Sequence, residues 1–305
     1  SRPVPLTNEE LNDYLKKDSL QILLKSKPYL DSIDSRDNKF KLLDPITGYT
    51  YANTYEKFRI KYSGPLSGIA FSTIQGYNTN VGLQFFKWYD DNQTNWFVAN
   101  VNASYGIDED KVRFKGSLIK KFNRKNNRRI SLSGGSEVQQ FNASEPISPL
   151  INTISTLFFE RNYLKVYELN FVRLAYQQEL FNGLETFINL GYENRQPLFN
   201  TSDHYLIPND VSYTSNNPRL PNDTNNAAID DHSIFKSQVT ARITFGQKYF
   251  SNPEMKFNIG NDLYPRLTMT FENGLGATNS DYNFSQLRAE LDQDFGLGNK
   301  GEFQY

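Results

Sequence analysis

The chain has 305 residues, a formal net charge of -1 and no cysteine. This balance gives no reason to expect binding to nucleic acid or to an anionic surface, and the absence of cysteine excludes disulfides and thiolate metal sites. The mean hydropathy is -0.63, and no apolar run approaches the roughly 18 residues of a spanning helix. Yet 23 Phe and 19 Tyr are present, which is typical of a transmembrane β-barrel with aromatic residues at its interfaces.

The first segment has a helical pattern. Thr7 and Glu10 have the T-x-x-E spacing of a capping box, and apolar residues follow at helical intervals. The helix should stop before Pro28, because proline disfavours helical geometry in the preceding residue. Residues 31–51 read as an irregular linker, so we assign 1–53 to a short periplasmic helix and a linker.

From Thr54 onward the chain alternates between apolar and polar residues. In "SIFKSQVTARITFGQ", for example, Phe235 and Val239 alternate with Lys236 and Arg242. Many such segments keep one alternation for ten or more residues, whereas soluble strands average ~5–6 and membrane strands need ~9–11. The pattern predicts an all-β fold, namely an antiparallel transmembrane β-barrel over 54–305 that is incomplete in this chain.

The connections between the predicted strands differ in length. Most are short, as at Phe181–Gly183, but about 197–231 forms a long segment rich in Asn, Asp, Ser and Pro. A structureless loop of that length is unusual in a compact soluble domain, whereas outer-membrane barrels have short turns on one side and long loops on the other. We therefore expect the long loop to be extracellular and Phe181–Gly183 periplasmic. The segment 149–163 fits a short helix or an irregular β segment equally well.

Charged residues recur on the polar side of the predicted strands. They either line a lumen that selects or binds something, or form ion pairs that fill the interior, and the second interpretation is favoured for any single residue. The candidate lumen-lining residues are Arg113, Lys115, Arg129, Arg173, Glu193, Lys236, Arg242, Glu272, Arg288 and Glu290.

Aromatic residues cluster at the expected strand ends. They predict an interfacial girdle, with packing at the rim of a soluble sheet as the alternative. The candidate girdle residues are Trp88, Tyr89, Trp96, Phe97, Tyr249 and Phe250.

No motif for chemistry stands out. His204 and His232 lack further metal-ligand residues around them, and we expect both on a solvated surface. No serine lies in a G-x-S-x-G context, and no Walker lysine follows Gly134-Gly135, which more simply mark a bulge or bend in a strand. We predict no catalytic residue, no metal and no cofactor.

Several phrases resemble a known family in their order along the chain. They are "RPVPLTNEELNDYLKKDSLQ", "NKFKLLDPITGYTYANTYEKFRI", "GGSEVQQFNASEPISPLINTISTLFFERNYLKVYE", "QELFNGLE" and "YENRQPLFNTSD". Together they resemble a Bacteroidetes outer-membrane β-barrel family of unknown function, whose members usually carry an N-terminal carboxypeptidase-regulatory-like domain. The resemblance implies that this chain is the middle portion of such a protein, with that domain ahead of it and the last strands behind it. It implies no catalytic residues.

The sequence leaves three functional hypotheses. The first is a non-enzymatic barrel protein of the cell outer membrane that acts in transport, export or envelope assembly. Its expected partners are outer-membrane lipid and periplasmic or envelope proteins, without nucleic acid. The second is a soluble β-rich binding protein, for example for glycans, and the third is a barrel-based outer-membrane hydrolase.

Overall fold

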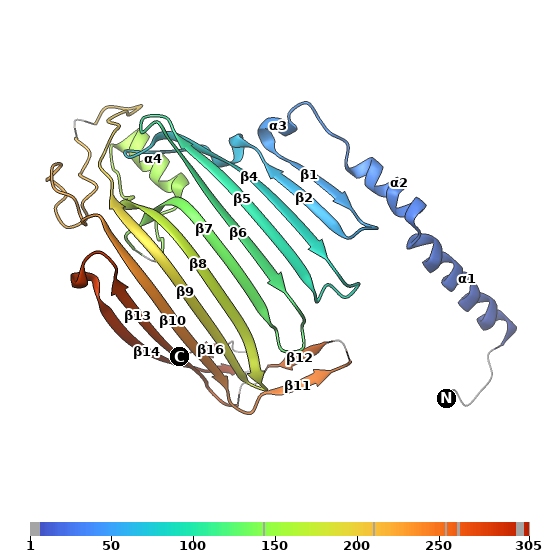
Figure 1. The fold of residues 1–305 in the computed structure, drawn as a ribbon. Coiled ribbons are helices and arrows are strands. Elements are labelled where there is room, and N and C mark those ends of the chain that lie inside the picture. Colours follow the sequence, from blue (N-terminus) through green and yellow to red (C-terminus); the bar gives the residue numbers. More distant parts are fainter. Residues whose placement is uncertain are drawn as a thin grey trace.

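A computed structural model describes residues 7–142, 144–209, 211–253, 255–260, 263–296 and 302–304. Its first elements are helices α1 (Asn8–Leu24) and α2 (Lys27–Asp37), which extend away from the sheet in Figure 1. The predicted capping box is present, because Thr7 and Glu10 each accept a hydrogen bond from the other's backbone N–H. Within the part of the chain that the structure describes, every helix is too short or too polar to cross a membrane.

Residues 31–51 are more regular than the expected linker. α1 ends before Pro28, as predicted, but Pro28 then lies in the first turn of α2, where a missing backbone N–H is tolerated. The short α3 (Asp44–Thr47) follows, and the first strand already begins at Tyr49.

One large antiparallel sheet makes up most of the chain. Its order is β1-β2-β4-β5-β6-β7-β8-β9-β10-β13-β14, with β3 paired to β4 as well. The strands are β1 (Tyr49–Asn53), β2 (Phe58–Ser63), β3 (Ala70–Ser72), β4 (Gly76–Trp88), β5 (Trp96–Gly106), β6 (Lys111–Lys121), β7 (Arg129–Gln140), β8 (Val166–Phe181), β9 (Leu184–Pro197), β10 (His232–Thr244), β13 (Arg266–Gly276) and β14 (Phe284–Asp292). The predicted antiparallel β fold is thus confirmed. The sheet is not closed, because β1 and β14 are its two edges among the described residues, so a barrel is not confirmed.

Smaller elements lie between and beyond these strands. α4 (Pro149–Phe159) occupies the segment that the sequence left open between helix and irregular β structure. The others are η1 (Pro65–Gly68), η2 (Ser280–Tyr282), the hairpin of β11 (Lys248–Ser251) and β12 (Lys256–Ile259), and the pair β15 (Asp294–Gly296) and β16 (Glu302–Gln304).

The sheet has two unlike faces. Paired residues of adjacent antiparallel strands point to the same side, so the register can be followed from Ile60 through Phe85 to Ala99 and onward to β14. One face, the apolar face, carries large hydrophobic side chains that stay exposed, such as Phe114 at 61% and Leu287 at 68%. The other, the polar face, carries the charged and amide residues.

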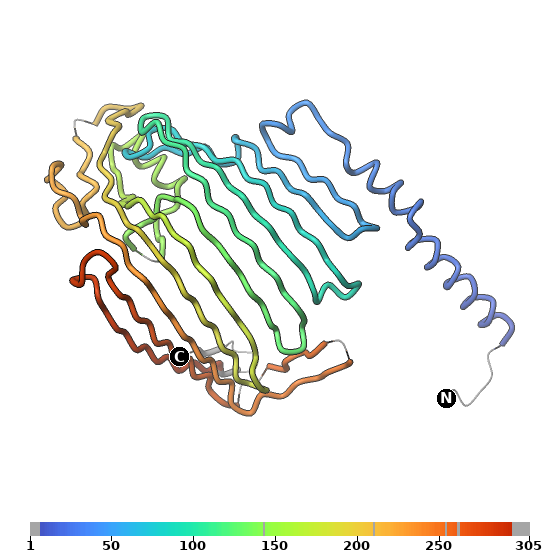
Figure 2. The backbone as a smooth tube through the Cα atoms, in the orientation of Figure 1, coloured from blue at the N-terminus to red at the C-terminus, as the bar shows by residue number. Residues whose placement is uncertain are grey.

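The two ends of the sheet also differ. At the turn end, the connections 89–95, 122–128 and 182–183 are short, and 245–265 is long because it contains the β11–β12 hairpin. The cap end carries the long connections 64–75, 141–165 and 198–231 beside the short 107–110 and 277–283. Figure 2 follows these connections along the backbone, and Figure 1 shows α4 near one end and the β11–β12 hairpin at the other.

A glycine lies where β7 separates from β6. β6 and β7 stop pairing at Lys115 and Gly135, while β7 and β8 continue to pair as far as Gln140 and Val166. Gly135 has a φ of +135°, and a Cβ there would lie 2.2 Å from the Phe114 carbonyl oxygen. Only glycine fits this position, and it is here that the pairing of β7 with β6 ends. The β7–β8 register continues through Gly134 and Gly135 without a shift, so the expected bulge or bend remains a prediction.

Candidate functional site on the polar face

The ten candidate lumen-lining residues all lie on the polar face. The register pairs Lys236 with Gly191 and Gly191 with Arg173, and it pairs Gln238 with Glu272, so that these charged positions share one side of the sheet. Alternation alone was sufficient to bring them together, because a strand directs every second side chain to the same side.

Most of these charges are neutralised by neighbours across the strands. Arg173 pairs with Glu193 at 2.8 Å, and Lys236 pairs with Glu272 at 2.8 Å. Lys115 pairs with Glu137 at 2.7 Å. Amide and hydroxyl side chains continue the pattern across β4, β5 and β6: Gln84 donates to Asn100, which donates to Ser117. The face is therefore polar but largely self-satisfied.

A buried ion cluster lies where β7 and β8 leave β6. The Arg113 side chain is only 1% exposed, and it donates to Glu168 and to Glu109, each at 2.8 Å. Glu168 also accepts from the Ser136 hydroxyl at 2.6 Å and lies 3.3 Å from the Lys111 ammonium. This geometry lets two buried charges persist, because each has several partners.

The long loop is anchored at the cap end by buried asparagines. Asn162 donates to the Thr214 carbonyl at 2.7 Å, and Asn216 donates to the carbonyls of Val166 and Leu198, both at 2.6 Å. Side-chain amides thus replace the backbone pairing that a loop without helix or strand lacks.

Lys165 is a second anchor of this loop. Its ammonium donates to the Thr214 hydroxyl and to the Ser215 carbonyl, both at 2.7 Å. Burial lowers the pKa of Lys165 to about 8, because no carboxylate compensates the desolvated charge. Burial also raises the pKa of Tyr213 to about 12, with Glu160 adding to the effect.

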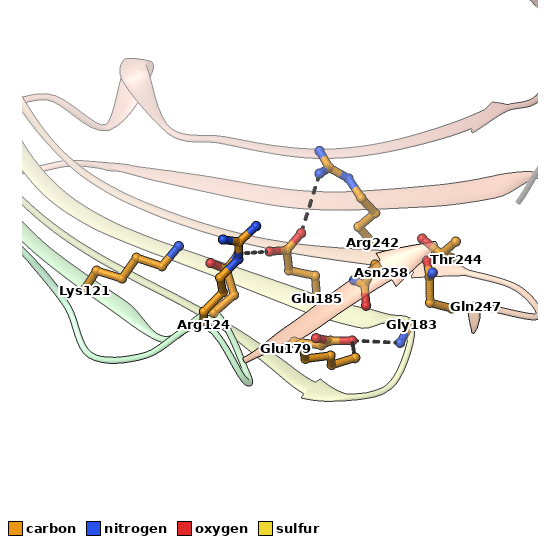
Figure 3. A pocket seen from close by; sticks show the side chains of 11 residues that line it. Lys121, Arg124, Glu179, Gly183, Glu185, Arg242, Thr244, Gln247 and Asn258 are labelled. Atoms are coloured by element: carbon orange, nitrogen blue, oxygen red, sulfur yellow. Dashed lines mark hydrogen bonds and ion pairs between the residues drawn. The ribbon is translucent and has the colours of Figure 1, made fainter. Parts of the chain in front are cut away.

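A pocket lies at the turn end of the polar face. It has a volume of about 240 Å³, and one wall is the β11–β12 hairpin. The hairpin is held over the sheet by an ion pair between Lys256 and Glu179 and by the Arg124 guanidinium, which lies 4.4 Å from the centre of the Phe257 ring. Figure 3 shows Lys121, Arg124 and Arg242 around Glu185.

The six candidate girdle residues do not share one face. Trp96 of β5 is paired with Trp88 of β4 and with Lys121 of β6. Because paired residues point to the same side of the sheet, both tryptophans lie on the polar face with Lys121. Phe97 is on the apolar face beside Lys120, whose ammonium lies 3.6 Å from the centre of the Tyr89 ring. The two tryptophans therefore do not fit a lipid-facing girdle.

Tyr249 and Phe250 lie outside the large sheet. Both are exposed on β11, and the Lys256 ammonium lies 4.8 Å from the centre of the Tyr249 ring. Their role in a girdle remains a prediction.

The two histidines occupy different environments. His204 lies beside Tyr77 on the cap and is exposed, as expected. The expectation is wrong for His232, which is 2% exposed and stacks on Tyr282 with ring centres 3.5 Å apart. Among the described residues, no three His, Asp or Glu side chains are grouped so as to hold a metal ion.

Several residues of the site were missed by the sequence reasoning. Lys121 extends the alternation of β6 and could have been included on that ground. Arg124, Glu179 and Lys256 come from a turn, a strand end and the hairpin, and no periodic signal connects them.

Comparison with protein-family models matches residues 43–305 to one family, described as "Family of unknown function (DUF5686) C-terminal domain". No curated protein and no solved structure matches the chain.

Proposed function

Residues 43–305 place the chain in this DUF5686 family of unknown function. Since the family gives no function, we propose one from the two unlike faces of the sheet. The chain forms part of the wall of an outer-membrane β-barrel that acts without catalysis in transport, export or envelope assembly. The apolar face contacts lipid, and the polar face is turned to water. The cap end, with the 198–231 loop, faces outward, and the turn end faces the periplasm.

The exposed apolar face carries the proposal. Its large side chains extend over strands from β4 to β14, and no second sheet covers them among the described residues. These exposed residues are Leu83, Val101, Val112, Phe114, Leu118, Ile130, Leu132, Val172, Leu174, Leu190, Tyr192, Phe235, Val239, Met269, Phe271, Leu275, Leu287 and Leu291. Soluble monomers rarely expose contiguous apolar patches larger than a few hundred Å², so this face indicates a non-aqueous neighbour.

Strand length supports the same neighbour. β5, β6 and β13 each have 11 residues. At a rise of ~3.3 Å per residue and a tilt of ~40°, 11 residues extend over roughly 28 Å, close to the apolar band of about 25 Å in membrane barrels.

Two adjacent positions of β10 test the proposal. The chain has no cysteine, so Val239→Cys and Gln238→Cys each create a single labelling site, one on each face. With a polarity-sensitive fluorophore attached in lipid vesicles, we expect a spin-labelled lipid to quench position 239 and aqueous iodide to quench position 238.

The matched pair separates the hypotheses. Stronger iodide quenching at 239 than at 238, or recovery of the protein in the soluble fraction without detergent, would refute the membrane proposal and favour the soluble binding protein. A barrel-based hydrolase gains no support from the geometry of the polar face, whose acids are engaged with bases such as Arg113 and Arg173.

A further inference from the structure

The pocket at the turn end contains more basic than acidic side chains. Its charged lining consists of four bases and two acids, which are Lys121, Arg124, Arg242, Lys256, Glu179 and Glu185. Thr244 and Asn258 add neutral polar groups to the same wall.

Both acids are already engaged within the protein. Glu179 pairs with Lys256 and accepts from the Gly183 N–H at 3.1 Å. Glu185 accepts from Asn127 at 2.9 Å and from Gln177 at 2.7 Å, and lies 3.6 Å from Arg242. The two acids therefore pair directly with Lys256 and Arg242, and among the described residues the other two cations have no direct ion pair.

Lys121 and Arg124 are these remaining cations. The partly buried Lys121 side chain makes no hydrogen bond or ion pair with the residues that the structure describes, and Glu185 attracts its charge only from a distance. Arg129 is directly opposite it in the register. Arg124 contacts the Phe257 ring, which leaves the donors at the edge of its guanidinium plane available. Figure 3 shows both side chains directed into the same space.

We propose that this pocket binds a small water-soluble oxyanion of the phosphate or phosphate-monoester type, held by Lys121 and Arg124. A guanidinium matches two phosphate oxygens with two parallel N–H donors, and an ammonium adds a compact charge. The volume of about 240 Å³ is below the range of ~300–1,000 Å³ usual for larger ligands. The site lies on the polar face and does not depend on what the apolar face contacts.

The bound anion would also connect two parts of the fold. Arg124 lies in the turn between β6 and β7, whereas Lys256 and Asn258 belong to the β11–β12 hairpin. An anion between them ties the hairpin to the sheet, so ligand binding should raise the thermal stability of the protein.

Titration of the full chain in detergent with inorganic phosphate tests the site, with sodium chloride at equal ionic strength as the reference. Isothermal calorimetry should give saturable binding, and both Lys121→Gln and Arg124→Gln should weaken it at least tenfold. Lys125→Gln is the matched control, because Lys125 is exposed in the same turn and does not line the pocket. It should leave the affinity within twofold of the wild type.

Each outcome of these titrations either supports the phosphate site or overturns it. The proposal is overturned if the wild type shows no saturable phosphate binding. It is also overturned if Lys125→Gln loses as much phosphate affinity as the two pocket variants, because such a result indicates a general attraction of anions to the positive charge of the turn. Glycerol phosphate and phosphatidic acid in mixed detergent micelles separate the two sources of this chemistry, because both carry a phosphate monoester. Binding of the soluble ester supports the site, and binding of the lipid form alone overturns it. The two pocket variants remove no internal ion pair, and chloride-buffer unfolding curves confirm that each one folds.

Discussion

Replacing Arg113 with methionine should destabilise the fold far more than replacing Lys115, two residues along the same strand. Both side chains are on the polar face and both pair with a glutamate of the neighbouring strands. They differ in burial, because Arg113 is 1% exposed at its side chain and Lys115 is 47% exposed. They also differ in their partners, because Arg113 pairs with Glu109 and Glu168 and Lys115 pairs with Glu137.

The structure sets the size of the effect. Arg113→Met leaves Glu168 buried with only Ser136 and Lys111 as partners, and it also takes the base from Glu109, whose side chain is 11% exposed. Removing one partner of a buried pair costs about 3–5 kcal/mol, and the two retained partners place this variant near the lower end, at about 3 kcal/mol. The exposed Lys115 pair should contribute about 0–1 kcal/mol.

Urea unfolding in detergent micelles measures both variants, with the fluorescence of Trp88 and Trp96 as the signal. The triple variant Arg113→Met/Glu168→Met/Glu109→Gln should recover most of the loss, because it leaves neither glutamate without its base and uncharged groups can replace a buried ion cluster at little cost. A loss below about 1 kcal/mol for Arg113→Met, or no recovery in the triple variant, would refute the argument.

Three further changes probe other parts of the chain. Gly135→Ala should cost more than about 2 kcal/mol because of its positive φ and backbone clash, whereas Gly116→Ala, whose nearest atom would be 3.4 Å away, should cost less than about 1 kcal/mol in the same urea assay. Burial lowers the pKa of Lys165 from 10.5 to about 8, so between these pH values the unfolded chain binds more protons than the folded one and the stability should rise with pH. The melting temperature of the wild type minus that of Lys165→Met should therefore increase from pH 8 to pH 10.5. A difference that does not change with pH would contradict this. Thr7→Ala removes a helix cap worth about 1 kcal/mol and should speed amide exchange in the first turn of α1, with no change in the sheet.

The faces of the strands could be predicted because a period of two needs no tertiary information. Lys236 and Arg242 were placed with Glu272 on that basis, and the register confirms it. The tryptophans are not explained by this periodicity. Trp88 and Trp96 end their strands on the polar side, where Arg59 lies over the Trp88 ring at 5.8 Å, and residue type alone does not distinguish a lipid-facing aromatic residue from one that stacks on a cation.

The pocket could not be predicted because its members are distant in sequence. Lys121, Glu185 and Arg242 belong to three strands, and Lys256 belongs to a hairpin that folds back over the sheet. The sequence shows that the long loop is rich in Asn. It does not show that Asn216 is buried and donates a hydrogen bond to the backbone of β8. Such contacts depend on where a loop returns, which local patterns do not encode.

In the proposed lipid environment, the backbone groups at the two edges of the sheet need hydrogen-bond partners. Among the residues that the structure describes, β1 and β14 each have a row of unpaired backbone groups along one side, and the nine residues of β14 are nearly all exposed. Water can satisfy such an edge, but hydrocarbon cannot, because each unpaired amide there costs several kcal/mol. If the apolar face contacts lipid, strands must therefore pair with β1 and β14 in the membrane. The polar face has no such requirement, because most of its charges are matched by neighbours such as Glu193 and Glu272, and water can solvate the others.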